Sequence, residues 1–447
     1  MIGAPERRAF EARRWCSRPV IGALAVALEA TAAQAADPPA DDQGGVAAAW
    51  QSVRRAAVTH GFDLTAVYDG EALANARGGV RTGGVYVGAL RLGLTIDGSR
   101  LLGWEGMTVF ASGLHSHGGA PSGFVGDAQG VSNLAAPTGA ELYEAWIQQN
   151  LFDNRVSVLA GRYDLNTEFY RLQSAGLFLN SSFGAGPEFS QSGHGGPSMF
   201  PDPSVGVRLG VKPARGVVVR AAMLDGAPVY RPGVGDRVFA PGDGLLFVGE
   251  SAFLSRPARA SRPQGQRLRI GRNSGLPPYE SKVAIGGWCY TARFDDTSER
   301  LPNRDPVSHL GSTGAYLLLD ALLNGGAAQP RRPFHGFVQL GLGDFRVDRF
   351  GFYGGAGVTV SGFIPALASD ELGLAVALAR NGAHYLDDAR RTGDPATRAE
   401  VAIEGTYLLQ MGEHLALQPD LQYVVSPGTD PPLKNAIVFA LRFELAT

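Results

Sequence analysis

The chain has 447 residues, of which 45% are apolar and 18% are charged, and its formal net charge is −2. This balance creates no global field that would attract nucleic acid or acidic lipid, so we expect no nucleic-acid partner. Glycine accounts for 61 residues, about twice the usual ~7% share, but proline accounts for only 28 and no Gly-X-Y period occurs, which excludes a collagen-like chain.

The first 35 residues have the pattern of a cleavable export signal. A basic region ending at Arg18 precedes a short apolar run, Val20 to Leu28, and Ala33-Gln34-Ala35 fits an A-x-A cleavage site. A membrane anchor is disfavoured because the run is far shorter than the ~18–20 residues that span a bilayer. We therefore predict a signal peptide over residues 1–35 and an exported mature chain that is periplasmic, secreted or in the outer membrane.

The mature chain begins with an expected periplasmic segment, residues 36–61, that contains a short helix at Val46–Thr59. Residues 62–447 then form the predicted β-barrel domain. Sixteen strands are expected, at Phe62–Tyr68, Tyr86–Ile96, Met107–Leu114, Leu142–Gln149, Val156–Tyr163, Val205–Val211, Val217–Asp225, Gly244–Glu250, Lys282–Tyr290, Ala315–Asp320, Phe334–Gly341, Phe352–Ser361, Glu371–Arg380, Glu400–Met411, Leu415–Val425 and Asn435–Phe443.

The last three strands show the pattern most clearly. Glu400 and Glu404 share one phase of their strand, whereas Val401, Ile403 and Leu409 occupy the other. Strands that are half apolar suit a sandwich or a barrel. Ionisable residues on the second face, together with lengths near the ~9–11 residues that cross a bilayer, favour a transmembrane, antiparallel, up-and-down barrel.

The connections between the expected strands alternate in length. Short ones fall at one end of the strands, whereas His115–Glu141 and Asp164–Ser204 are long and fall at the other. An even strand count with short periplasmic turns and long outer loops is typical of bacterial barrels, and closure leaves no unpaired sheet edge. One segment departs, because the periplasmic turn Ser251–Ser281 is long and rich in arginine. Either it is an insertion or the register differs there.

Four separated blocks resemble one family. They are LLGWEGMTVFASGLHSHGGAPS (Leu101 to Ser122), VGDAQGVSNLAAP (Val125 to Pro137), SAGLFLNSSFGAGPEFSQSG (Ser174 to Gly193) and LALQPDLQYVVSPG (Leu415 to Gly428). In this order they are similar to the carbohydrate-selective porins of the OprB family of Gram-negative outer membranes. The resemblance covers most of the chain from Trp50 to Phe443.

The resemblance implies a sixteen-stranded barrel through which sugars such as glucose diffuse passively into the periplasm. It also implies an outer loop folded into the lumen, for which Asp164–Ser204 is the candidate. The expected partners are small sugars, outer-membrane lipid and the barrel-assembly machinery, with homo-oligomerisation left open. One departure is that Phe443 is followed by Glu444-Leu445-Ala446-Thr447, whereas such barrels usually end in an aromatic residue.

The polar residues on the inward phase are the candidate pore-lining and substrate-binding residues. They are Arg91, Arg208, Arg220, Arg442, Glu400, Glu404, Asp420, Gln418 and Gln422. Mixed charges and amides can replace part of the hydration shell of a neutral sugar, whereas a ring of one sign would select ions. A lumen arginine that pairs with a carboxylate across the barrel would instead be structural. Trp146, Tyr163 and Trp288 could stack on sugar faces or belong to the wall.

Catalytic and metal-binding patterns are weak. His115-Ser116-His117 has a spacing that could chelate a metal, but no cysteine or carboxylate cluster lies beside it in sequence, and no G-x-S-x-G motif occurs. We therefore expect no catalytic residue, no metal and no cofactor. Two alternatives to a carbohydrate channel remain: a general diffusion porin for small polar solutes, and a barrel enzyme acting on lipid, which would need a serine aligned with a histidine on the lipid-facing phase.

Overall fold

The computed structural model describes residues 46–228, 238–255, 279–325, 332–364, 370–412 and 414–447. The chain divides into two units, residues 1–55 and 56–447. The described part of the first unit is the beginning of helix α2 (Val46–Thr59), where a helix is predicted. The predicted signal peptide lies outside the described residues. No helix in the described part of the chain is both long and apolar enough to cross a membrane.

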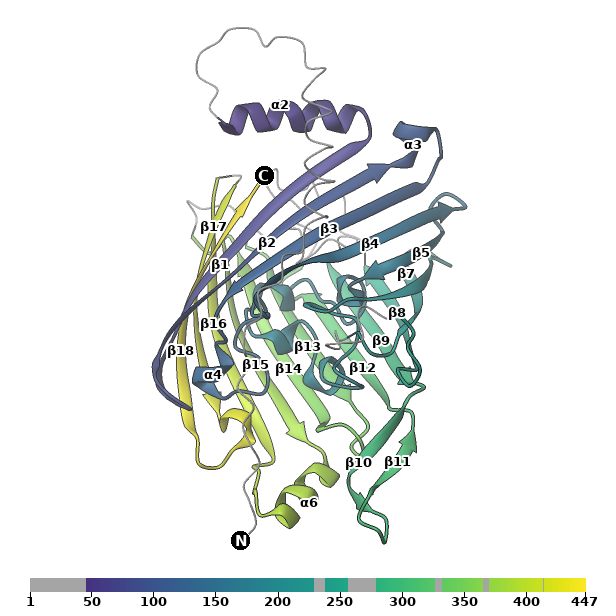
Figure 1. Cartoon of the computed structure of the whole chain (residues 1–447). Helices are drawn as coiled ribbons and strands as arrows, with labels where there is room; N and C mark the ends of the chain where they lie inside the picture. Colours follow the sequence, from purple (N-terminus) through teal and green to yellow (C-terminus); the bar gives the residue numbers. More distant parts are fainter. Residues whose placement is uncertain (1–45, 229–237, 256–278, 326–331, 365–369, 413) are drawn as a thin grey trace. The chain divides into compact units, whose positions relative to one another are not determined.

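In the second unit, sixteen of the described strands close into one barrel (Figure 1). All neighbours in the barrel are antiparallel, and the first strand closes the sheet against the last. The barrel strands are β1 (Phe62–Gly79), β2 (Gly83–Asp97), β3 (Met107–Gly118), β4 (Gly139–Leu151), β5 (Val156–Tyr163), β6 (Ser204–Val211), β7 (Val217–Asp225), β8 (Leu245–Ser255), β9 (Ser281–Tyr290), β12 (Thr313–Leu322), β13 (Phe334–Leu342), β14 (Phe350–Ser361), β15 (Glu371–Asn381), β16 (Ala399–Met411), β17 (Leu415–Val425) and β18 (Lys434–Ala446).

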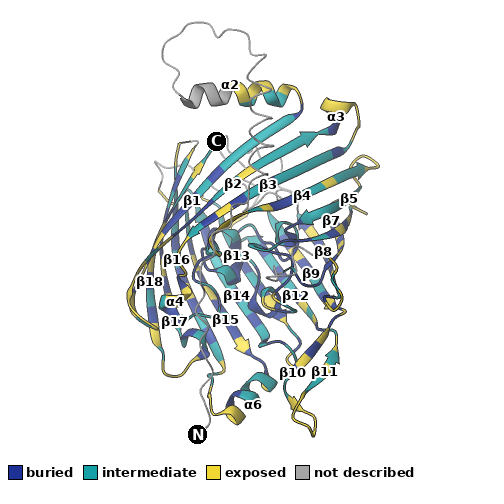
Figure 2. Ribbon diagram, in the orientation of Figure 1, coloured by how far each residue is buried: buried dark blue, intermediate teal, exposed yellow. Residues whose placement is uncertain are grey.

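Each strand has one buried and one exposed face, as its alternating sequence predicts. In β8, Leu246, Val248 and Glu250 are buried, whereas Phe247 and Phe253 are 42% and 57% exposed. Figure 2 shows this alternation along the strands. An exposed face of large apolar side chains suits the hydrocarbon core of a bilayer, where a closed barrel also satisfies every backbone N–H and C=O group.

All sixteen predicted strands are found, but several are longer than predicted. β1 continues to Gly79 because it pairs with β2 from Phe62 opposite Ile96 to Asn75 opposite Gly83. The exposed positions at its outer end are alanines, which are only weakly apolar. The apolar–polar alternation is therefore weak there, and the predicted strand ended too early. The four residues after Phe443 are not a free tail, since Glu444 and Leu445 continue β18 opposite Asp69 and Tyr68.

The strands on either side of the arginine-rich segment Ser251–Ser281 pair in the predicted register. β8 extends to Ser255, which pairs with Ser281 at the start of β9, so the two strands run together on both sides of the connection. The connection is therefore an insertion between paired strand ends. Its arginines, from Arg256 to Arg272, lie outside the described residues.

The short turns 152–155 and 212–216 lie at one end of the barrel, which we assign to the periplasm, and the long connections 119–138, 164–203 and 382–398 lie at the other. Two connections depart from this rule, the three-residue turn 80–82 at the outer end and the long β8–β9 connection at the periplasmic end. A hairpin that the sequence did not predict, β10 (Arg293–Arg300) with β11 (Pro306–Leu310), lies in the outer connection between β9 and β12 (Figure 1). Short helices lie in several of the other connections. They are α3 (Gly98–Leu102), α4 (Ser122–Val125), η1 (Leu165–Thr167), η2 (Ala175–Leu177), η3 (Ser181–Phe183), α5 (Pro187–Ser190), α6 (Ala383–Thr392) and η4 (Pro427–Thr429).

Candidate functional site

The connection between β5 and β6, residues 164–203, lies inside the barrel and is called the inner loop here (Figure 1). This confirms the prediction that Asp164–Ser204 folds inward. The ring of Phe189 stacks on Trp288 of β9 at 4.3 Å between centroids, and Tyr170 meets Tyr316 of β12 at 4.5 Å. Burial of each such aromatic side chain contributes about 1.5–3 kcal/mol. The inner loop therefore packs against β9 and β12 inside the lumen.

Carboxylates on the barrel wall hold the backbone of the inner loop. Glu404 of β16 accepts hydrogen bonds from the N–H groups of Leu179 and Asn180, at 2.5 and 3.0 Å. Asp320 of β12 accepts both the N–H and the hydroxyl of Ser174, at 3.1 and 2.7 Å. Because loop N–H groups in a closed lumen need acceptors, these carboxylates satisfy donors that would otherwise be buried without partners.

A second inner segment, residues 119–138 between β3 and β4, is held in the same way. Glu400 accepts hydrogen bonds from the N–H groups of Ala128 and Gln129 at 2.8 and 2.9 Å. It also accepts the N–H of Gly428, at 2.5 Å, from the connection between β17 and β18. One wall carboxylate thus joins two outer connections.

The amides of β17 face the same two segments. Gln418 donates to the carbonyl of Leu177 at 2.7 Å, and Gln422 donates to that of Val131 at 2.8 Å. Gln422 also donates to Asp420 at 3.0 Å. All three side chains are buried.

Three of the predicted arginines are buried in ion pairs. Arg208 of β6 forms a two-pronged contact with Glu168 of the inner loop, at 2.7 and 2.9 Å, and Arg220 of β7 lies 3.8 Å from the same carboxylate. Arg442 of β18 pairs with Glu71 of β1 and donates to Asn133 at 2.8 Å. Two-pronged arginine–carboxylate contacts fix geometry as well as charge.

Arg91 of β2 differs from the other predicted residues in exposure. Its side chain is 19% exposed, against 3%, 8% and 5% for Arg208, Arg220 and Arg442. It donates to Asp69 of β1 at 2.5 Å. The structure thus places all nine predicted residues on the inward face. Contact with a permeating solute stays a prediction for each of them.

A band of polar groups lies beside Arg91, and we call it the polar strip: Arg91, Tyr143 and Glu144 on the wall, and Asp164 and Arg171 from the inner loop. The Tyr143 hydroxyl donates to Asp164 at 2.6 Å, and the Asp164 N–H donates to Glu144 at 3.2 Å. Arg171 lies close enough to Asp164 and Arg91 to interact with both charges. The last four are 6–9% exposed, whereas Glu400 and Glu404 are fully buried.

Burial shapes the electrostatics of the inner-loop members of the polar strip. Burial raises the pKa of Asp164, and the hydrogen bond from Tyr143 offsets part of that rise. Burial lowers the pKa of Arg171, and Asp164 opposes that shift. Both signs of charge therefore meet at one place on the lumen wall, with hydrogen-bond donors and acceptors side by side.

Several functional residues were missed by the sequence analysis. Glu250 of β8 accepts the N–H of Tyr170 at 3.0 Å and forms a buried ion pair with Lys282 of β9 at 2.9 Å. Gln339 of β13 donates to the carbonyl of Phe183 at 3.0 Å. The sequence could have identified Glu250, Lys282 and Gln339, because each is a polar residue on the inward phase of a predicted strand. The loop residues Glu168 and Arg171 carried no such signal.

The aromatic candidates divide by environment. Trp288 and Tyr163 are buried, the former beneath Phe189. Trp146 of β4 is partly exposed and lies 5.1 Å from Phe110 of β3, ring to ring. Trp146 is therefore the partly exposed ring of the three, and its side chain hydrogen-bonds Glu144 of the polar strip.

His115 and His117 do not form a hydrolase-like pair with a serine. Their rings lie 5.7 Å apart, and His117 contacts the hydroxyl of Tyr68 at 3.2 Å. Ser116 is buried on the opposite face of β3. The lipid-hydrolase alternative requires a nucleophile beside the histidine, and the contact that the structure provides is a phenol.

Comparisons with known proteins agree with this architecture. The model of the carbohydrate-selective porin, OprB family, matches residues 81–446. Porin B of Pseudomonas aeruginosa is 23% identical over 473 aligned positions that cover 95% of each chain. A structure of Pseudomonas putida OprB at high pH has a TM-score of 0.77 and 20% identity, and covers 92% of this chain and 100% of that one. The low-pH structure of the same protein has a TM-score of 0.54 and 16% identity, with coverages of 91% and 100%.

Proposed function

This chain belongs to the carbohydrate-selective porins of the OprB family, and from that premise we propose that monosaccharides such as glucose cross its barrel by passive diffusion past the polar strip. The chain is an outer-membrane porin for carbohydrates, and its fold points to a channel rather than an enzyme.

The observation that carries the proposal is the uneven exposure of the polar side chains on the lumen wall. The inner loop packs against β9 and β12, and the fully buried wall carboxylates lie beneath the inner loop and the second inner segment. The partly exposed Arg91 and Trp146 lie on β2 and β4. A solute that crosses the barrel therefore meets the polar strip rather than the opposite wall.

The chemistry of the polar strip suits a neutral, hydroxyl-covered solute. Each sugar hydroxyl both donates and accepts, so it can bond a carboxylate and a guanidinium in turn. The partly exposed indole of Trp146 adds a surface for the apolar face of a sugar ring. Because the charges are mixed and already paired, no single sign dominates to trap an ion.

Four of the nine predicted pore-lining residues have a structural role in this proposal. Their side chains bond the backbone of the inner loop and of the second inner segment, and so fix the width of the passage without touching the solute. These residues are Glu400, Glu404, Gln418 and Gln422. Interaction with the barrel-assembly machinery and self-association remain predictions.

The test is the conductance of the purified protein in planar bilayers, with and without mono- and disaccharides. Saturable block of the current by a monosaccharide is expected, since the polar strip binds sugar during passage. Conductance steps that no sugar alters would favour the general diffusion porin. That result would overturn the proposed sugar path without changing the family.

A further inference from the structure

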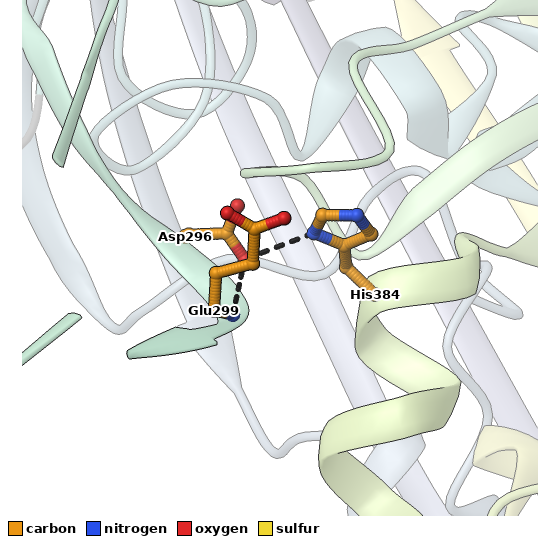
Figure 3. Close-up of side chains that lie close together, drawn as sticks. All are labelled: Asp296, Glu299 and His384. Carbon is orange, nitrogen blue, oxygen red and sulfur yellow. Dashed lines mark hydrogen bonds and ion pairs between the residues drawn. The ribbon is translucent and has the colours of Figure 1, made fainter. Parts of the chain in front are cut away.

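A compact group of ionisable side chains lies outside the lumen, on the outer connections. Asp296 and Glu299 come from β10, and His384 comes from α6 (Figure 3). One ligand-type atom from each of the three lies within 4.8 Å of the other two. The connections that meet here are separate in sequence, since β10 follows β9 and α6 follows β15.

Asp296 is the fixed centre of this group. Its carboxylate is buried and contacts two imidazoles, His384 Nδ1 at 2.9 Å and His309 Nε2 of β11 at 2.8 Å. The backbone N–H groups of Ser298 and Glu299 also donate to it. Burial raises the pKa of Asp296, but these hydrogen bonds outweigh burial and lower the pKa below its usual range. Asp296 is thus an oriented anion rather than a surface carboxylate.

Glu299 is the exposed member of this group. Its carboxylate lies beside that of Asp296 (Figure 3), and in the part of the chain that the structure describes it accepts no hydrogen bond and forms no salt bridge. Two carboxylates at this separation repel each other unless a positive charge lies between them. The guanidinium of Arg346 is held by Asp344 at 2.9 and 2.7 Å, and it lies close enough to Asp296 and Glu299 to interact with both charges.

From this geometry we propose that His384, Asp296 and Glu299 bind one divalent transition-metal ion of the Zn²⁺ type, with His309 as the residue that positions Asp296. An imidazole nitrogen and two carboxylate oxygens are ligands of such ions, and an imidazole disfavours Mg²⁺ and Ca²⁺. Three protein ligands leave a coordination position for water.

His384 Nδ1 donates a hydrogen bond to Asp296, so this nitrogen carries a proton in the ion-free protein. Coordination through Nδ1 requires that this proton leave the nitrogen. His309 keeps its hydrogen bond to the other oxygen of Asp296, in the manner of an outer-shell partner.

The bound ion ties the β10–β11 hairpin to α6 at the outer end of the barrel. Two other contacts already join these elements, Arg300 to Asp388 at 3.4 Å and Arg391 to the carbonyl of Ser298 at 2.8 Å. These contacts hold the ligands near one another before an ion arrives, which reduces the ordering cost of binding. The site does not depend on the sugar path proposed above.

The experiment is calorimetric titration of the full-length, detergent-solubilised protein with Zn²⁺, for the wild type, Glu299→Gln and Asp295→Asn. Glu299→Gln removes a ligand that makes no hydrogen bond in the ion-free protein, so folding should be unaffected while affinity falls by about tenfold or more. Asp295→Asn is the matched control, since it removes one negative charge from an exposed residue on the same strand. One site per chain and unchanged affinity in the control are expected.

Hydrogen exchange gives a second readout. Zn²⁺ should slow exchange in both 293–310 and 383–392 of the wild type, and should not do so in Glu299→Gln. Equal Zn²⁺ affinity in the wild type and Glu299→Gln would overturn the proposal, as would equal losses in Glu299→Gln and Asp295→Asn. Mg²⁺ binding as tight as that of Zn²⁺ would overturn the assigned metal class.

Discussion

The carboxylate of Glu404 accepts the backbone N–H of Leu179 at 2.5 Å, although the two residues lie 225 positions apart in the chain. One belongs to the wall of the barrel and the other to the loop that fills it. The width of the passage therefore depends on bonds between the wall and the loop as much as on the diameter of the barrel.

Replacing Glu404 by Gln should loosen the inner loop. The amide keeps one acceptor oxygen but turns an NH₂ group toward the second backbone donor, Asn180. We expect a loss of about 1–3 kcal/mol in stability, and noisier, larger single-channel currents. The reversal potential in a salt gradient should stay constant, because Glu404 is buried.

The control for this experiment is Glu105→Gln, in an exposed turn at the other end of the barrel from the outer loops. A shifted reversal potential with unaltered current noise would contradict the loop-holding role. It would show instead that Glu404 faces permeating ions directly.

Replacing Arg91 by Gln should weaken sugar binding without releasing the inner loop. A hydrogen bond from a charged group is worth about 1.5–3 kcal/mol, which corresponds to roughly ten- to hundredfold weaker block by a monosaccharide. Loss of a lumen cation should also shift selectivity toward cations. The measurement is the sugar concentration that halves the current, together with the reversal potential.

Arg77→Gln serves as the comparison for Arg91→Gln, since Arg77 is exposed near the outer end of β1. If Arg91→Gln and Arg77→Gln leave sugar block equally unchanged, the polar strip is not on the sugar path.

Deleting Gly184–Gly196 should widen the channel. This segment includes Phe189, whose ring covers Trp288, so its removal opens lumen space along β9 and β12. We expect a severalfold rise in single-channel conductance and weaker discrimination between mono- and disaccharides. Unaltered conductance in a correctly folded barrel, checked by circular dichroism, would contradict the role of the inner loop as the constriction.

The stability of the inner loop should fall as pH rises. Burial raises the pKa of Glu188 to about 7 in the folded protein, and the Tyr170 hydroxyl, at 2.8 Å, lowers it only in part. A carboxyl group whose folded pKa exceeds its unfolded value binds protons more tightly when folded, so its contribution is complete below the unfolded pKa of 4.5 and is lost as pH rises to about 7. The corresponding loss is about 3 kcal/mol.

Hydrogen exchange of the inner loop between pH 4 and 8, corrected for intrinsic rates, measures this loss. Glu188→Gln should abolish the decline, whereas Glu105→Gln should preserve it. A pH profile that is identical in the wild type and Glu188→Gln would show that Glu188 does not titrate as its buried position requires.

The sequence by itself determined the barrel, its strand count and the face on which each predicted residue lies. Alternation of period two is a local property, so Glu400, Glu404, Gln418 and Arg442 could be assigned to the inward face without knowledge of their partners. The resemblance of Ser174–Gly193 to a family also indicated the inward path of the inner loop.

Only the tertiary structure decided what the inward residues contact. The outer end of β1 and the polar hairpin β10–β11 carry little apolar alternation, so hydrogen bonds to neighbouring strands define them instead. Whether a lumen carboxylate meets solute or a loop N–H depends on where residues 164–203 run inside the barrel. Contacts such as Glu404 with Leu179, or Asp296 with His384, join segments distant in sequence, and no local pattern encodes such pairings.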